Sequence, residues 1–115
     1  MAIRRLRRVE KQYRETFRTW DLVLSPTLGH VVPPIGHLSP NQDFEELFAK
    51  LVDYVGFTPL ANVAGAPAIS LPAGLTEGDH LPLAAMLSAG HGDERTLLEV
   101  AYEVEAACPF PRITG

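Results

Sequence analysis

The chain has 115 residues, 46% of them hydrophobic and 21% charged, which is typical of one globular domain or of part of a larger one. Its apolar stretches fall short of the roughly 18 residues that a membrane span needs, so we expect neither a membrane partner nor a signal peptide. The single cysteine, Cys108, has no partner for an internal disulfide, and the expected compartment is therefore the cytoplasm.

Positive charge is concentrated at the start of the chain. Seven of the ten basic residues fall within the first 18 positions, whereas twelve of the fourteen acidic residues follow Trp20. Such asymmetry occurs in nucleic-acid-binding arms, which makes a basic binding helix the third-ranked hypothesis. Apolar residues recur among the arginines at spacings of three and four, which favours an outer helix at about 3–19 and no nucleic-acid partner. These apolar residues are Ile3, Leu6, Val9, Tyr13, Phe17 and Trp20.

A short buried strand is predicted at about 21–25, and irregular backbone follows it as far as residue 40. The next helix is predicted at about 40–55. Ser39 is its expected N-cap, and Gln42 three residues later completes a capping box. Gly56 is expected to end this helix.

The last part of the chain predicts a hairpin followed by a helix. After a turn or short helix at 57–65, strands are expected at about 67–71 and 82–88, and a final helix at about 93–107. Leu97, Ala101 and Val104 are expected to face inward from that helix. The sequence thus predicts an α/β fold of three short strands and three to four helices, in a single segment 1–115. Three strands alone leave sheet edges open, which indicates part of a larger sheet.

No residue pattern in the chain indicates a catalytic or metal centre. None of the four serines lies in a Gly-x-Ser-x-Gly elbow, and neither lysine stands in a position suited to a catalytic lysine. Ser25 has the best position for ligand contact, since it ends a strand, whereas Ser70 and Ser88 lie within strands. His30 and His37 have no recognised ligand spacing, so neither a metal nor a cofactor is expected.

The order of these pieces resembles the C-terminal portion of the amidase signature family. The resemblance is carried by Asp21-Leu-Val-Leu-Ser-Pro-Thr27, by the turn Asn62-Val-Ala-Gly-Ala-Pro67 and by the elements that surround them. It extends from about Arg5 to Phe110. Several branches of this family fit the resemblance equally. They are the hydrolases of aryl, aliphatic, peptide and cyclic amides, including the cyclic-oligoamide (nylon-oligomer) hydrolases.

The resemblance implies a mixed β-sheet covered by helices and a serine amidohydrolase activity. The nucleophilic serine, the serine at a cis peptide and the lysine of that family stand in segments with no counterpart here, so no catalytic residue is assigned to this chain. By position, the substrate-pocket residues would be Ser25, Pro26, Thr27, Leu28, Phe57 and Asn62. For Asn62 the equal alternative is that its side chain only ties down its own turn.

Two partner hypotheses follow from this resemblance. In the first, the chain is an amidase fragment that is inactive alone, and the complete enzyme, which includes the N-terminal remainder, binds a small-molecule amide. In the second, the chain is a non-catalytic truncated module that self-associates or pairs with a separate N-terminal subunit, because the sheet alone would expose an apolar patch.

Overall fold

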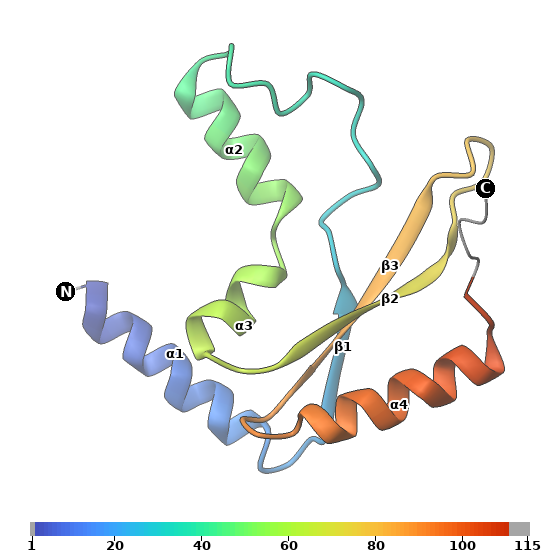
Figure 1. The fold of residues 1–115 in the computed structure, drawn as a ribbon. Coiled ribbons are helices and arrows are strands. Elements are labelled where there is room, and N and C mark those ends of the chain that lie inside the picture. The colour runs from blue at the N-terminus through green and yellow to red at the C-terminus, as the bar shows by residue number, and fades with distance from the viewer. Residues whose placement is uncertain (1, 111–115) are drawn as a thin grey trace.

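The computed structural model describes residues 2–110, and these form four α-helices around one three-stranded antiparallel sheet (Figure 1). The predicted α/β fold of three short strands and three to four helices is confirmed. No helix in this part of the chain is long and apolar enough to cross a membrane. In chain order the elements are α1 (Ala2–Thr16), β1 (Leu22–Pro26), α2 (Phe44–Tyr54), α3 (Thr58–Ala64), β2 (Ala68–Leu75), β3 (Pro82–Ala89) and α4 (Glu94–Ala107).

The strand order is β1-β3-β2, and the register gives the two faces of the sheet different chemistry. Residues paired directly across antiparallel strands point to the same face. One row therefore joins Leu24, Leu87 and Ile69 on a face of large apolar side chains. The neighbouring row, of Ser25, Met86 and Ser70, lies on the opposite face.

The apolar face of the sheet packs against α4. Leu97 of α4 is only 3% exposed and forms the buried core with Leu71, Leu87 and Ala89 of the strands. Ala101 and Val104 pack against this cluster, as their spacing along the helix predicts. Figure 1 shows α4 on one side of the sheet, and α1 with α3 on the other.

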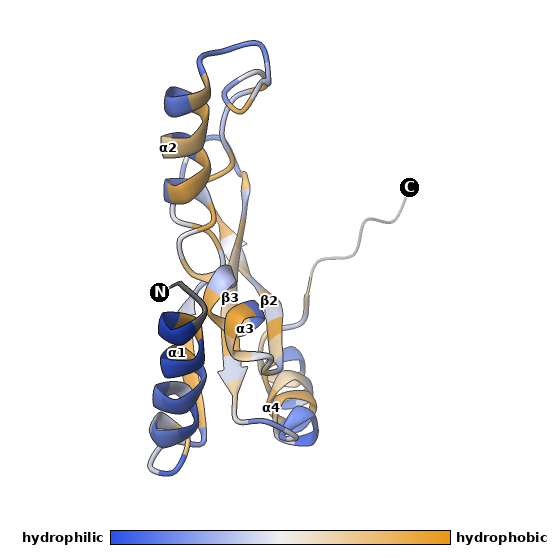
Figure 2. Cartoon of the chain, turned by 90° about the vertical axis from the view of Figure 1, so that its left-hand side faces the viewer, coloured by the Kyte–Doolittle hydropathy of each residue, from blue (hydrophilic) through white to orange (hydrophobic). Residues whose placement is uncertain are grey.

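The apolar stripe of α1 is only partly covered. Tyr13 is 7% exposed, but Leu6 is 50% exposed and Trp20, beyond the end of the helix, is 63% exposed. The stripe is therefore covered only along the second half of α1, where Tyr13 reaches the end of β3. The side chain of Ile3 falls outside the described residues. Figure 2 shows that the rest of α1 is almost entirely hydrophilic.

Residues 29–55 form an arm that carries α2 away from the sheet (Figure 1). The backbone N–H of Gly29 donates to the carbonyl of Tyr54 at 2.9 Å, which closes the base of the arm. Further out, the Lys50 ammonium donates to the Gln42 side chain at 2.6 Å, while the Gln42 amide donates to the carbonyls of His37 and Ser39. The arm is thus held mainly by contacts within itself.

The predicted cap of this helix is wrong. The helix begins at Phe44, and the carboxylate of Asp43 accepts hydrogen bonds from the N–H groups of Glu45 and Glu46. The Ser39 hydroxyl instead accepts a hydrogen bond from the N–H of Asn41, in the loop before the helix. The helix ends where the sequence predicts, since Val55 is its C-cap and Gly56 follows directly. Gly56 does not, however, adopt the left-handed conformation that Gly65 adopts at the end of α3.

Candidate functional site

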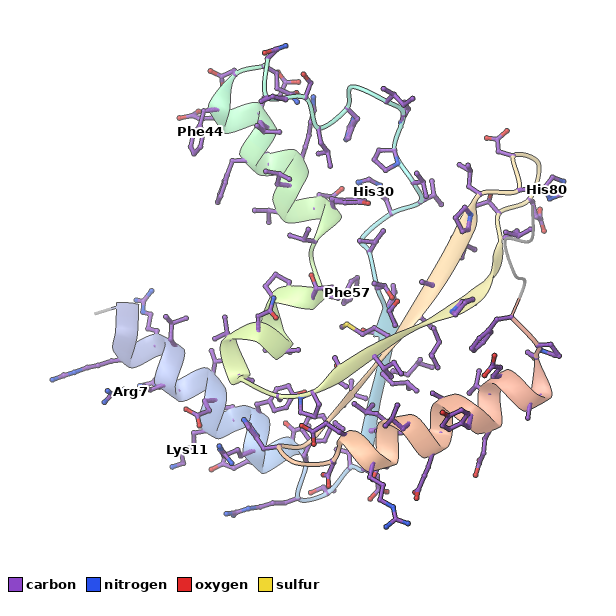
Figure 3. All side chains as sticks on the ribbon, in the orientation of Figure 1. Arg7, Lys11, His30, Phe44, Phe57 and His80 are labelled. Atoms are coloured by element: carbon purple, nitrogen blue, oxygen red, sulfur yellow. The ribbon has the colours of Figure 1, made fainter. Side chains whose placement is uncertain are left out.

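A hollow of about 570 Å³ lies on the hydroxyl-bearing face of the sheet, under α1 and α3. Two of the predicted pocket residues, Ser25 and Phe57, line it. Figure 3 shows Phe57 directed from the start of α3 toward the strands. The other lining residues come from four different elements and from the ends of loops: Val9, Gln12, Tyr13, Thr16, Phe17, Val23, Gly56, Leu60, Met86 and Ser88.

A second, smaller hollow of about 130 Å³ begins where β1 ends. Pro26, Thr27 and Leu28 line it together with His30 and the first residues of the arm. The segment 25–28 therefore divides between the two hollows, since Ser25 faces the larger one and the next three residues face the smaller one. The sequence predicts a single pocket for residues 25–28 and does not distinguish the two hollows.

Asn62 lies outside both hollows. Its side chain is exposed on α3, and within residues 2–110 no hydrogen bond of that side chain is found. The turn after α3 is closed instead by the backbone, where the N–H of Gly65 donates to the carbonyl of Asn62 at 3.3 Å. In the described contacts, the Asn62 side chain therefore neither lines a hollow nor closes the turn after α3.

The hydroxyl groups around the site already have hydrogen-bond partners. Ser25 Oγ donates to the carbonyl of Pro26 at 3.0 Å, and Thr27 Oγ1 lies 2.9 Å from Ser70 Oγ, across the small side chains of β3. Neither a lysine nor a histidine is among the residues that line the larger hollow. Without an adjacent base, a serine hydroxyl is a weak nucleophile. These side chains are thus suited to shaping a pocket and to hydrogen bonding.

Tyr13 and Ser88 are contributions to the site that sequence reasoning missed. The Tyr13 hydroxyl donates to the carbonyl of Ala89 at 3.1 Å and also hydrogen-bonds the buried Ser88 side chain. Burial raises the pKa of the Tyr13 phenol, and the bond to Ser88 partly offsets that rise. The helical stripe indicated that Tyr13 faces inward, but no local pattern identifies a partner more than 70 positions away.

His91 joins the end of β3 to α3. Its Nε2 lies 2.7 Å from the carbonyl of Ala64, so this nitrogen is the protonated donor. The ring is half-buried and forms a link between two elements. Among residues 2–110 no three His, Cys, Asp or Glu side chains come together as a metal site.

The sequence profile described as Amidase matches residues 1–98. The chain belongs to the amidase family. Its relatives include the AmiC protein of Mycobacterium leprae, named as an amidase, with 44% identity over 112 residues. Another is the 6-aminohexanoate-cyclic-dimer hydrolase of Pseudomonas sp. strain NK87, with 37% identity over 97 residues. These alignments cover 97% and 79% of this chain.

Solved structures give the same result. The structure of a 6-aminohexanoate cyclic dimer hydrolase complexed with substrate superposes with a TM-score of 0.80 at 34% identity. That match covers 91% of this chain but 23% of the hydrolase. The chain likewise spans 24% of the length of AmiC. The described fold is therefore part of an amidase fold, as the resemblance predicts.

Proposed function

We propose that this chain is the C-terminal portion of a serine amidohydrolase that cleaves the C–N bond of carboxamides. In the complete enzyme a serine oxygen attacks the amide carbonyl, the amine leaves with a proton, and water then hydrolyses the acyl-enzyme. The serine, the cis-peptide serine and the lysine would be supplied by the portion of the enzyme that has no counterpart in this chain.

The role proposed for this chain is to build one wall of the substrate pocket. Its residues would be Ser25 and Phe57 in the larger hollow and Pro26, Thr27 and Leu28 in the smaller one, whereas Asn62 lies outside both hollows. The observation that carries this proposal is the 570 Å³ hollow, because it combines apolar walls with the polar groups of Ser25 and Gln12. Such a combination is typical of small-molecule sites. The substrate-bound relative at TM-score 0.80 is a cyclic-dimer hydrolase, which supports a substrate class of amides that includes cyclic ones.

The test is a fusion protein, called here the AmiC fusion, in which this chain replaces the matching segment of M. leprae AmiC. Hydrolysis of a panel of linear and cyclic amides is measured for the fusion and for the chain alone. We expect turnover by the fusion only. Substitution of Phe57 by Ala, in the larger hollow, is expected to raise KM about tenfold, because an aromatic wall of the pocket is lost.

The exposed residue Leu75 gives a matched control, because it lies at the far end of β2 and lines neither hollow. Leu75→Ala is expected to leave KM unchanged. Amide hydrolysis by the chain alone would contradict the proposal, as would a fusion that folds but hydrolyses no amide of the panel.

The second candidate is a non-catalytic module that self-associates or pairs with a separate subunit. The observation in its favour is the exposure of large apolar side chains, among them Leu24 at 70% and Phe44 at 74%. Sedimentation of the chain at several concentrations tests it. A stable dimer without activity in the AmiC fusion favours this candidate, and a monodisperse monomer argues against it.

A further inference from the structure

The larger hollow, of about 570 Å³ under α1 and α3, is lined by four hydroxyl groups among residues 2–110. Ser25 Oγ donates its hydrogen to the carbonyl of Pro26 at 3.0 Å. Thr16 Oγ1 donates to the carbonyl of Gln12, about one helical turn earlier, at 3.1 Å. A hydroxyl group has one hydrogen, so these two groups can accept a hydrogen bond from a ligand but have none to donate.

The other two hydroxyl groups, of Tyr13 and Ser88, use their hydrogens in the same way. The Tyr13 hydroxyl donates to the carbonyl of Ala89 at 3.1 Å. In the bond between the two side chains Ser88 is consequently the donor and the Tyr13 oxygen the acceptor. The described lining residues therefore offer no hydroxyl hydrogen to a ligand carboxylate, which binds through donors.

The larger hollow also lacks charge. None of the described residues that line it is charged at neutral pH. Two cations of α1, Lys11 and Arg14, pair instead with Glu15 at 3.9 Å and with Glu10 at 3.1 Å on the exposed surface of the helix. A carboxylate or ammonium group that enters the hollow would lose part of its water shell and meet no opposite charge. Burial of an unpaired charge is strongly unfavourable.

The walls of the larger hollow are mainly hydrocarbon. Their large apolar side chains come from α1, from the sheet and from α3 with the residue before it: Val9, Phe17, Val23, Met86, Phe57 and Leu60. Met86 at the floor is only 6% exposed, and its unbranched side chain adapts to ligands of different shape. Gln12 adds a neutral amide, which can bond another amide but cannot neutralise a charge.

Resting on the proposed function, we propose that the larger hollow binds an uncharged hydrocarbon part of the amide substrate, an alkyl chain or an aromatic ring. The hollow thereby selects against amides that carry a carboxylate or an ammonium group at that place. Removal of alkyl surface from water favours binding, whereas a charged group of similar size loses water without gaining a partner. Because the selectivity arises from the missing charge, a charged side chain introduced into the wall should relax it.

The smaller hollow does not share this property. His30 lines it, and histidine is the side chain whose charge ordinarily changes near neutral pH. His30 Nε2 also lies 4.0 Å from a carboxylate oxygen of Asp53. The exclusion of charge is therefore confined to the larger hollow, and its test uses residues that line only that one.

Two sets of matched amides test the selectivity in the AmiC fusion. In the acyl set, hexanamide, adipamate and 5-aminopentanamide carry a methyl, a carboxylate or an ammonium group at the end of the same chain. The amine set makes the same replacement in N-pentylacetamide, 5-acetamidopentanoate and N-(4-aminobutyl)acetamide. In at least one set we expect kcat/KM to be about 100-fold lower for both charged members than for the neutral one. Equal kcat/KM within both sets would overturn the proposal.

A charged variant assigns the selectivity to this hollow. Leu60 lines the larger hollow and is 54% exposed, so α3 accommodates Leu60→Lys, whose ammonium supplies the missing counter-charge. We expect the ratio of kcat/KM for the carboxylate member to that for the neutral member to rise about tenfold. Leu75→Lys is the matched control, because Leu75 lines neither hollow, and it should leave the ratio unchanged. Equal ratios in the two variants would contradict the proposal.

Binding to the chain alone covers the case of a fusion that does not fold. The hollow is lined by residues of this chain, so the neutral member of one set should shift the NMR signal of the Met86 methyl group in a saturable manner. The charged members of that set should not shift it at the same concentration. Equal shifts by all three members of each set, or no shift by any amide, would overturn the proposal.

Hydrolysis by the fusion is read separately from selectivity. Saturable binding of neutral amides alone, without hydrolysis by a folded fusion, supports the selective hollow and contradicts the proposed function. Hydrolysis without discrimination between neutral and charged members supports the function and overturns the selectivity.

Discussion

Tyr13 attaches α1 to the sheet through a single buried hydroxyl. It bonds Ala89 and Ser88 at the end of β3, and its ring lies 4.7 Å from that of Phe17, centroid to centroid. We expect Tyr13→Phe to lower the free energy of unfolding by about 1–2 kcal/mol, because buried partners lose a hydrogen bond. Urea unfolding measures the change. Tyr102→Phe is the matched control, since Tyr102 is 70% exposed on α4.

The same phenol predicts a pH dependence. Burial raises the folded-state pKa of Tyr13 above that of the unfolded chain, which is about 10. The stability that this group contributes is therefore complete below pH 10 and is lost as the pH rises through the raised pKa. Unfolding at pH 8 and pH 11 should show a steeper loss for the wild type than for Tyr13→Phe. Parallel losses in the two proteins would contradict this assignment.

Gly29 lies where only a glycine fits. A Cβ built on it would stand 1.9 Å from the backbone carbonyl oxygen of Asp53, and backbone atoms have little freedom to move away. Gly29→Ala is expected to open the base of the arm, destabilise the chain and speed proteolysis between residues 29 and 55. Gly56→Ala is the matched control, because its nearest contact would be an ordinary 3.5 Å. Equal proteolysis of the two variants would show that the arm is not closed at Gly29.

Among the elements, α2 offers a direct comparison of two caps. Asp43→Ala is expected to lower the free energy of unfolding by about 1 kcal/mol, because two N–H groups of the first turn lose their acceptor. Ser39→Ala should have a smaller effect, since Ser39 lies outside the helix. Helix content by circular dichroism and urea unfolding measure both variants. A larger loss of unfolding free energy for Ser39→Ala than for Asp43→Ala would instead support Ser39 as the N-cap, as the sequence predicts.

The sequence supports the order and type of every element but not the start of α2. Ser39 with Gln42 and Asp43 with Glu46 both fit the spacing of a capping box. Local contacts within the arm decide between them, since the Gln42 side chain bonds the preceding loop and Lys50. Likewise the hairpin of β2 and β3 is readable from turn residues. The placement of β1 beside β3 is not, because it joins segments about 60 positions apart.

Part of the candidate site could be predicted from the sequence, because some of its residues belong to recognisable local segments. Ser25 and Phe57 belong to local segments whose character is visible in the sequence, and they come to line one hollow. Met86 and Ser88 line it too, but in the sequence they are ordinary members of an apolar strand. Their role follows from the face of β3 on which they lie, which only the strand pairing determines.

At the scale of the whole molecule, the chain is more extended than a compact domain. Its radius of gyration is 16.6 Å, against about 13 Å for a compact domain of this length. The arm and the thin sheet account for the difference, since the molecule measures 43 × 40 × 22 Å along its principal axes. This shape suits a portion of a larger fold whose surfaces are completed by other segments.

The clearest incomplete surface outside the sheet is one side of α2. Phe44 and Phe48 stack with ring centroids 5.9 Å apart, and they are 74% and 57% exposed. Figure 3 shows Phe44 on the side of α2 turned away from the loop of the arm. A stacked pair of exposed aromatic rings is unusual on a free surface and is typical of a contact with another segment.

We predict that removing these two rings affects the AmiC fusion but not the chain alone. Replacing Phe44 and Phe48 together by Ser should leave the unfolding free energy of the chain alone nearly unchanged, because both rings are already in water. In the AmiC fusion the same change should destabilise by about 3–6 kcal/mol if both rings are buried there, at about 1.5–3 kcal/mol for each. The matched control replaces Leu98 and Tyr102 of α4 by Ser; these two side chains are 52% and 70% exposed. If the Phe pair and the control pair destabilise the fusion equally, α2 is not the surface that the remainder of the amidase covers.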